Sequence, residues 1–187
     1  MMNEEFTPTE AIGRSLMREL YDWVEAGIVA VVCVIILFTF GIRMAGVDGA
    51  SMNPTLHDQD LLVISRMLYQ PVCGDIVVIT KPNHQQKPLI KRVIATEGQT
   101  VDIDFDKGVV YVDGAALQEP YTAEPTYHSY DMVFPQTVPQ GCVFAMGDNR
   151  NESWDSRAAE VGMIDARYIL GKVIYRILPY NQMGIPQ

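Results

Sequence analysis

Residues 88–94, Pro88-Leu89-Ile90-Lys91-Arg92-Val93-Ile94, have the composition and alternation of a buried β-strand. Successive side chains of a strand point to opposite faces, so Lys91 shares a face with Leu89 and Val93 while Arg92 points away. A lysine on a solvated strand face is the ordinary interpretation of such a position. The alternative is a lysine enclosed by apolar neighbours, where burial would lower its pKa from the usual value of about 10.4.

On either side of this run, short β-branched segments alternate with turn residues, which predicts antiparallel β structure. The strand that contains Lys91 is expected over residues 89–95, and the six further segments are residues 61–65, 75–80, 100–105, 109–113, 142–146 and 169–178. Asp106-Lys107-Gly108 predicts a hairpin turn between two of them, with Val101 and Ile103 opposed to Val110 and Val112.

The rest of the chain has less regular patterning. Residues 113–140 contain four prolines and predict an excursion or small subdomain rather than long elements. Outside the most apolar part of the chain, short helices are expected only around residues 10–23 and 156–160.

Before the strands, Ala26 to Ile42 form seventeen consecutive uncharged residues, about 25 Å long as a helix. With Tyr21 and Trp23 as interfacial residues, this predicts a membrane-spanning helix over residues 23–42. A cleavable signal peptide is the alternative, but six acidic residues precede the run and Arg43 stands where small residues would be required. A buried soluble helix would need a solvated face, for which this segment leaves little room.

The basic residues near the span favour a cytoplasmic N-terminus only slightly. The organisation expected is a cytoplasmic segment 1–22, the span 23–42 and an extracytoplasmic domain 43–187. From residue 43 onward the chain has twelve basic and seventeen acidic residues, which argues against nucleic acid as a partner. The three cysteines and three histidines have no metal-ligand spacing, so neither a metal nor another cofactor is expected.

A possible nucleophile lies in the segment Gly49-Ala50-Ser51-Met52-Asn53-Pro54-Thr55-Leu56, directly after the apolar run. A serine hydroxyl needs a neighbouring base, most often a histidine that is oriented by a carboxylate. His57 is poorly suited, because it follows Ser51 by six residues across a turn and has no evident acidic partner. A lysine whose neutral form is populated can replace the histidine, and Lys91 has the apolar neighbours for that role.

A third segment concentrates polar and charged residues beyond what folding ordinarily requires. It reads Gly147-Asp148-Asn149-Arg150-Asn151-Glu152-Ser153-Trp154-Asp155-Ser156-Arg157. Together with residues 51–56, 74–78 and 91–94, it matches in order four sequence boxes of one family. On these residues the chain resembles type I signal peptidases, membrane-bound serine proteases with a Ser-Lys dyad.

The resemblance implies a mainly β fold, with an antiparallel β-sheet ectodomain of signal-peptidase type on a single N-terminal transmembrane helix. It implies Ser51 as nucleophile and Lys91 as general base. Ser153 would hydrogen-bond the lysine amine. The other supporting residues of the dyad would be Asp155 and Arg157, as an ion pair, with Asp148, Asn149 and Arg150.

The implied substrates are secretory preproteins with small residues at the first and third positions before the cut. We expect shallow apolar pockets for these residues, lined by Met52, Val47, Leu56, Leu89 and Ile90. The lipid bilayer is an expected partner, and the resemblance leaves a partner in the translocation machinery open. Gly49 replaces the hydroxyl that some family members place two residues before the nucleophile, so a second oxyanion donor is not evident.

Three other functions share features with this sequence. A Ser-Lys peptidase dedicated to a single client stays open, because no residue names the substrate. A non-catalytic membrane-anchored assembly protein would lack the nucleophile or the base, and both are present. Penicillin-binding enzymes have the serine and lysine three residues apart in one helix, and the forty residues between Ser51 and Lys91 exclude that pattern.

Overall fold

The computed structural model describes residues 8–36, 41–67, 69–80 and 87–186. The chain divides between Gly41 and Ile42 into an N-terminal unit and a larger C-terminal unit.

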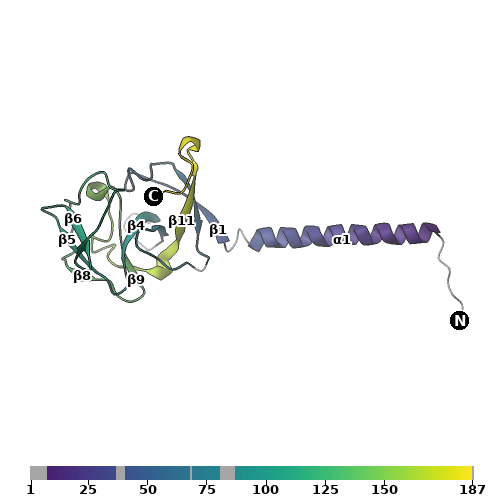
Figure 1. Ribbon diagram of the computed structural model, residues 1–187, viewed down its shortest axis with the longest axis horizontal. Helices are drawn as coiled ribbons and strands as arrows, with labels where there is room; N and C mark the ends of the chain where they lie inside the picture. Colours follow the sequence, from purple (N-terminus) through teal and green to yellow (C-terminus); the bar gives the residue numbers. More distant parts are fainter. Residues whose placement is uncertain (1–7, 37–40, 68, 81–86, 187) are drawn as a thin grey trace. The chain divides into compact units, whose positions relative to one another are not determined.

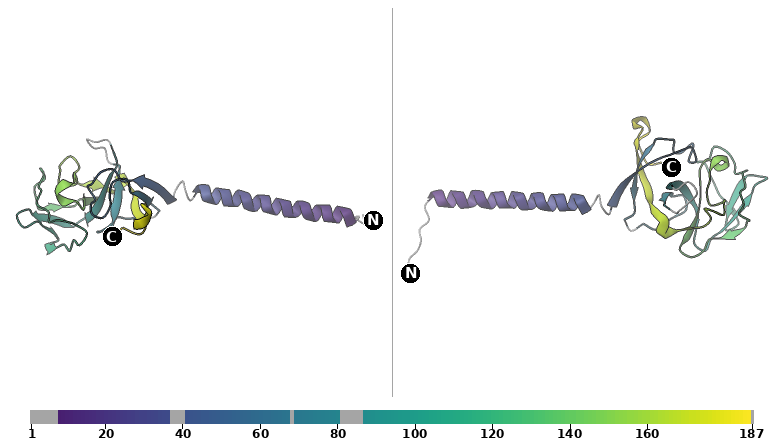
Figure 2. Two further views of the ribbon diagram at one scale, coloured as in Figure 1. Left: turned by 90° about the horizontal axis from the view of Figure 1, so that it is seen from above. Right: turned by 180° about the vertical axis from the view of Figure 1, so that it is seen from behind.

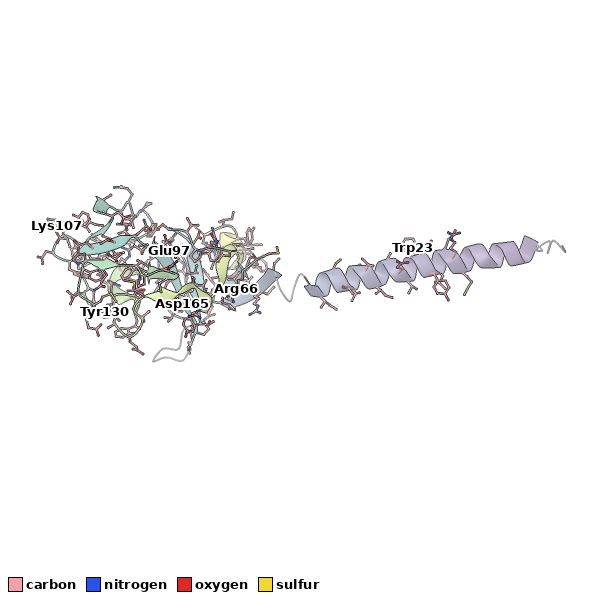
Figure 3. All side chains as sticks on the ribbon, turned by 90° about the horizontal axis from the view of Figure 1, so that it is seen from below. Trp23, Arg66, Glu97, Lys107, Tyr130 and Asp165 are labelled. Carbon is pink, nitrogen blue, oxygen red and sulfur yellow. The ribbon has the colours of Figure 1, made fainter. Side chains whose placement is uncertain are left out.

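The N-terminal unit contains helix α1 (Pro8–Ile36), drawn in Figure 1. Its side chains are exposed over residues 16–35, and Trp23 projects from the helix surface in Figure 3. Within the described ranges, no helix combines the length and the mean hydropathy that a membrane span requires. Residues 37–40 of the predicted span lie outside the described residues. Ile42 was predicted to end the span, but it pairs with Ser65 in a strand instead.

The C-terminal unit is mainly β, as predicted, and each of its strand pairs is antiparallel. Seven strands form one sheet in the order β1-β2-β11-β3-β4-β9-β10. In that order they are β1 (Ile42–Gly46), β2 (Leu61–Ser65), β11 (Ile169–Leu178), β3 (Ile76–Ile79), β4 (Leu89–Thr96), β9 (Cys142–Met146) and β10 (Ile164–Asp165). In both views of Figure 2, the yellow strand β11 lies close to the blue strand β1.

A second sheet has four strands in the order β7-β6-β5-β8. They are β7 (Ala115–Ala116), β6 (Val109–Val112), β5 (Thr100–Asp104) and β8 (Gln136–Thr137). Figure 1 shows β5, β6 and β8 grouped together, away from β1 and β11. Three short 3-10 helices complete the described elements, η2 (Arg150–Glu152), η3 (Ala166–Tyr168) and η4 (Tyr180–Gln182).

The predicted strands agree with these bounds, and the hairpin prediction is confirmed by the register of β5 and β6. Val101 pairs with Val112 and Ile103 with Val110. The prediction of a helix around residues 156–160 is wrong, because that segment forms turns around Asp155, whose carbonyl accepts from the amide of Ala158. Strand β1 and the two-residue strands β7, β8 and β10 were not predicted.

Buried apolar side chains form three clusters. The first lies under the segment that follows β1 and contains Met52, Leu56, Val78 and Ile90. The second contains Leu89 and Val93, so the predicted alternation along β4 is confirmed and both faces of this strand are buried. The third cluster joins the two sheets and includes Ile103, Val110 and Phe144.

Candidate active site

Ser51 lies in a turn between β1 and β2. The amide of Asn53 donates to the carbonyl of Ala50 at 3.0 Å, and the amide of Leu56 donates to that of Met52 at 2.9 Å. Met52 and Leu56 are buried and hold the turn on the first core cluster. Ser51 is half-buried between them and the surface. The turn therefore presents the hydroxyl from an anchored backbone.

The glycine that begins this turn has a defined role. Gly49 adopts φ +94°, a conformation that side-chain-bearing residues rarely adopt. Its amide donates to Oδ1 of Asp58 at 2.8 Å. The Gly49 amide is therefore already engaged and cannot serve as an oxyanion donor in this conformation.

Lys91 is 2% exposed, which answers the question left open by its strand position. Its Nζ lies 2.7 Å from Oγ of Ser51. Within the described residues, its amine forms no salt bridge. Burial lowers the pKa of Lys91 to about 8, and the carboxylates of Asp155 and Asp148 oppose that shift. A serine hydroxyl and an amine that loses its proton near neutral pH thus lie in hydrogen-bond contact.

The loop Gly147–Arg157 packs directly against the serine turn. Asn149 donates from its amide to the carbonyl of Ser51 and from its side chain to that of Ala50, both at 3.1 Å. A Cβ at Gly147 would lie 2.3 Å from the carbonyl oxygen of Ser51 and 2.2 Å from Oγ of Ser153. Only glycine allows so close an approach. The loop therefore holds the backbone of the serine turn in place through the carbonyls of Ala50 and Ser51.

The predicted ion pair of this loop is present. Arg157 donates to both carboxylate oxygens of Asp155 at 2.9 Å, and both side chains are buried. The same carboxylate accepts from the amide of Gly147 at 3.0 Å, and Arg157 also donates to the carbonyl of Arg150. The pair therefore joins the two ends of the loop.

A second buried pair links the loop to β4. Arg92 donates to Asp148 from Nε at 2.8 Å and from Nη2 at 2.7 Å. Thr55 of the serine turn donates to the same carboxylate, and the ring of Tyr121 lies 4.0 Å from the guanidinium of Arg92. Asp148 thus connects the strand of the lysine with the turn of the serine.

The predicted excursion supplies a third pair that sequence reasoning did not find. Arg150 donates to both carboxylate oxygens of Glu119 and to Oγ1 of Thr126. Arg150 is buried, and Glu119 lies more than thirty residues earlier in the chain. No local pattern marks Glu119 as its partner, because the contact depends on how residues 113–140 fold back on the loop.

Ser153 does not make the predicted hydrogen bond to the Lys91 amine. Its Oγ is buried against Gly147 and has no hydrogen-bond partner in the described part of the chain. The Lys91 amine instead lies 2.7 Å from Oγ of Ser51. Ser153 therefore remains beside the dyad with an unused hydroxyl.

A groove of about 840 Å³ passes over Ser51 and Lys91. Four of the five predicted pocket residues line it, namely Val47, Met52, Leu89 and Ile90. The fifth, Leu56, is packed under Met52 in the core and is not part of the lining. The lining also includes residues that sequence reasoning missed, among them Met44, Val78, Leu170, Glu152 and Trp154.

Comparisons with known proteins agree with this geometry. Residues 20–178 match the family described as "Signal peptidase, peptidase S26". The chain is 38% identical over 166 residues to "Probable signal peptidase I-1" of Synechocystis sp., which covers 83% of this chain and 81% of that protein. It is 32% identical over 185 residues to "Signal peptidase I" of Bacillus licheniformis, covering 94% and 97% of the two chains.

Among solved structures, a signal peptidase I from Enterococcus faecalis aligns with a TM-score of 0.45 and 27% identity. That alignment covers 56% of this chain and 97% of the other. The family match extends over most of the residues that build the groove, the serine turn and the loop behind it. The chain therefore belongs to the signal peptidase family, peptidase S26.

Proposed function

We propose that this signal peptidase removes signal peptides from secretory preproteins with Ser51 as nucleophile and Lys91 as general base. The observation that carries the proposal is the 2.7 Å contact between Nζ of Lys91 and Oγ of Ser51 inside a groove. With a pKa of about 8, roughly a tenth of the Lys91 amines are neutral at pH 7 and can accept the serine proton. A lysine at its usual pKa would be almost entirely protonated there.

In the proposed reaction, Ser51 Oγ attacks the carbonyl carbon of the scissile bond while its proton passes to Lys91 Nζ. The resulting ammonium then gives that proton to the leaving amine, and the new N-terminus departs. Lys91 next takes a proton from water, which attacks the carbonyl carbon of the acyl-serine. When the bond between that carbon and Ser51 Oγ breaks, Lys91 returns the proton to Oγ, and the signal peptide leaves with a new carboxylate. The Ser51 amide is our candidate oxyanion donor, since the Gly49 amide is engaged by Asp58.

The supporting residues act by fixing this geometry. Asn149 and Gly147 allow the loop to contact the Ser51 carbonyl, and the buried pairs of Asp155 and Asp148 keep the loop in place. We propose that the hydroxyl of Ser153 orients the Lys91 amine during the reaction. Its buried and unpartnered state supports that role, because an unused hydroxyl in this position is otherwise costly.

We propose that the buried lining of the groove makes the enzyme specific for small residues before the cut. Val47, Met52 and Ile90 line the groove and are themselves buried, so the core packed around them fixes their side chains. Alanine fits such a pocket, whereas a leucine or phenylalanine would have to displace core side chains. Leu56 belongs to the same apolar cluster as these three side chains and packs with them in the core.

We also propose that α1 anchors the enzyme in the membrane, with residues 1–22 cytoplasmic and the β unit extracytoplasmic. Apolar side chains of the helix, among them Ile28, Val31 and Ile35, are more than half exposed, which is unfavourable in water and favourable in lipid. Because Ile42 belongs to β1, the proposed span ends before it rather than at it. Extraction at alkaline pH tests the anchor, since an anchored protein stays in the membrane pellet.

The test of function is cleavage of a secretory precursor with an Ala-X-Ala site by the full chain in lipid, read by intact mass. Wild type is expected to cut after the second alanine, and Ser51→Ala and Lys91→Ala are expected to be inactive while folded. Lys107→Ala, on the exposed hairpin, is the matched control and should cut normally. A folded wild type that cuts nothing would refute general processing and favour a dedicated client.

A further inference from the structure

The loop Gly147–Arg157 buries most of its side chains, but two of them face the groove. Trp154 is 38% exposed and Glu152 is exposed, whereas their neighbours Ser153 and Asp155 are fully buried. Both exposed side chains line the same groove as Ser51 and Lys91. An exposed tryptophan next to reacting groups is a feature that the mechanism above does not use.

The direction of the groove places these two side chains relative to the scissile bond. Its walls are residues 44–52 and 87–91, which contain parts of β1 and β4. Four antiparallel pairings separate β1 from β4, so these two strands run in the same direction. Both walls run toward the dyad, since Ser51 lies near the end of one and Lys91 at the end of the other.

Residues of a substrate before the cut occupy the apolar part of these walls. Residues after the cut must then continue past the dyad. Outside the two walls the lining consists of Val78, Leu170, Glu152 and Trp154, and of these four Glu152 and Trp154 belong to the loop that packs against the Ser51 turn. The signal peptide and the mature protein therefore contact different parts of the groove.

Trp154 is held in a defined orientation. Its ring packs edge-on against Tyr130 with centroids 5.0 Å apart. The hydroxyl of Tyr130 donates to the carbonyl of Ser153 at 3.0 Å, and the guanidinium of Arg157 lies 5.3 Å from the Tyr130 ring. Figure 3 labels Tyr130 on the C-terminal unit. The indole is thus supported from the excursion and offers a preformed surface.

The charges around this surface favour a cation. In the described residues Glu152 forms no ion pair, and its carboxylate accepts a 3.3 Å hydrogen bond from the side chain of Asn149. The other acids near the dyad are neutralised, since Asp148 and Asp155 are paired with arginines. Asp48, another acidic residue of the lining, is paired with Lys87. An indole beside an unpaired carboxylate suits a lysine or arginine side chain.

We propose that Trp154 and Glu152 form a subsite for the first two residues of the mature protein, and that this subsite prefers a basic side chain to an acidic one. The inference rests on the proposed function, because it requires a substrate cut at the dyad. Glu152 and Trp154 are specificity-determining residues in this account and take no part in proton transfer.

The test compares precursor peptides that are identical except for Ala, Lys or Glu at the first or second position after the cut. For wild type, kcat/KM with Lys is expected to exceed that with Glu by roughly three- to ten-fold at one of these positions. Glu152→Gln should lower that ratio at least two-fold, and Trp154→Ala should lower it similarly. Trp154→Phe, which keeps an aromatic ring, should retain most of the preference.

Matched controls are Glu160→Gln and Tyr180→Ala, exposed residues that do not line the groove, and neither should change the ratio. A wild-type ratio near one, or a ratio unchanged in Glu152→Gln, overturns the subsite. If Trp154→Ala fails to fold, Glu152→Gln decides alone because its carboxylate is exposed. Failure of wild type to cut the alanine reference would instead refute the proposed function, and the subsite with it.

Discussion

The neighbouring residues Lys91 and Arg92 of β4 are both buried cations, but their charges are accommodated differently. Arg92 is paired with Asp148 through two short hydrogen bonds, whereas Lys91 forms no ion pair in the described residues and contacts a serine hydroxyl. Both side chains are almost completely buried. A buried cation is tolerated either when a counterion compensates it or when it can lose its proton. One side of the strand therefore stabilises the fold, and the other supplies a base.

The largest expected effect comes from removing the base. Lys91→Met should lower kcat/KM by about a thousand-fold or more, because the serine loses its proton acceptor. It should not destabilise the protein, since an apolar side chain replaces a desolvated amine. Cleavage assays measure the activity and thermal melting the stability. A variant that is active or much less stable would contradict the assignment of Lys91 to catalysis rather than to stability.

This prediction also has a pH dependence. The folded pKa of Lys91, about 8, lies below the unfolded value, so burial of its charged form destabilises wild type below pH 8. The penalty declines as the pH rises from about 8 toward the unfolded value. The melting temperature of Lys91→Met relative to wild type should therefore be higher at pH 7 than at pH 10. A difference in melting temperature between the two proteins that does not change with pH would argue against a lowered pKa of Lys91.

Removing the counterion of Arg92 should mainly lower the stability of the protein. Asp148→Asn leaves a buried guanidinium without its carboxylate, which should lower the free energy of unfolding by about 3–5 kcal/mol. Activity should fall with the loss of folded protein. Chemical denaturation monitors this effect, and a loss below about 1 kcal/mol would mean that the pair is less important than its burial indicates.

The contact between the excursion and the loop should have a smaller effect. Glu119→Gln keeps a hydrogen-bond acceptor for Arg150 but removes the charge, and we expect a loss of about 1–3 kcal/mol. Glu160→Gln, an exposed residue outside both the excursion and the loop Gly147–Arg157, is the matched control. Equal stability of the two variants would show that the excursion does not stabilise the loop through this pair.

The smallest effect is expected at the hairpin tip, where Lys107 is labelled in Figure 3. Lys107 and Asp104 form an exposed ion pair at 2.7 Å. Exposed pairs contribute little because water screens them. Asp104→Asn should leave the melting temperature unchanged within error, and a clear decrease would show that exposed pairs also stabilise this fold.

Local patterns predicted most of the fold. Features that depend on neighbouring residues could be predicted, and the structure confirms them. They are the strand periods, the turn at Asp106-Lys107-Gly108 and the shared face of Leu89 and Val93. Strand β1 was missed because its residues Ile42–Gly46 follow an apolar run and pair with a distant strand. The helix predicted over residues 156–160 failed because buried Asp155 and Arg157 hold that segment in turns.

For the site, the sequence located the serine, the lysine and the loop, but not their supports. Glu119 and Tyr130 are brought to the loop by the path of the excursion, which no periodicity specifies. Leu56 was placed in the groove because it follows the serine closely, yet the turn directs it into the core. Trp154 looked like one more residue of a polar segment until its exposure and its support by Tyr130 were visible.

The most direct test of the central claim is the pH dependence of kcat/KM for wild-type cleavage of a precursor peptide. If Lys91 is the base, the rate should rise with pH as one group with a pKa of about 8 loses its proton, and should level off above it. A profile that is already level from pH 6 to 9, or that follows a group near pH 6.5, would contradict a lysine base.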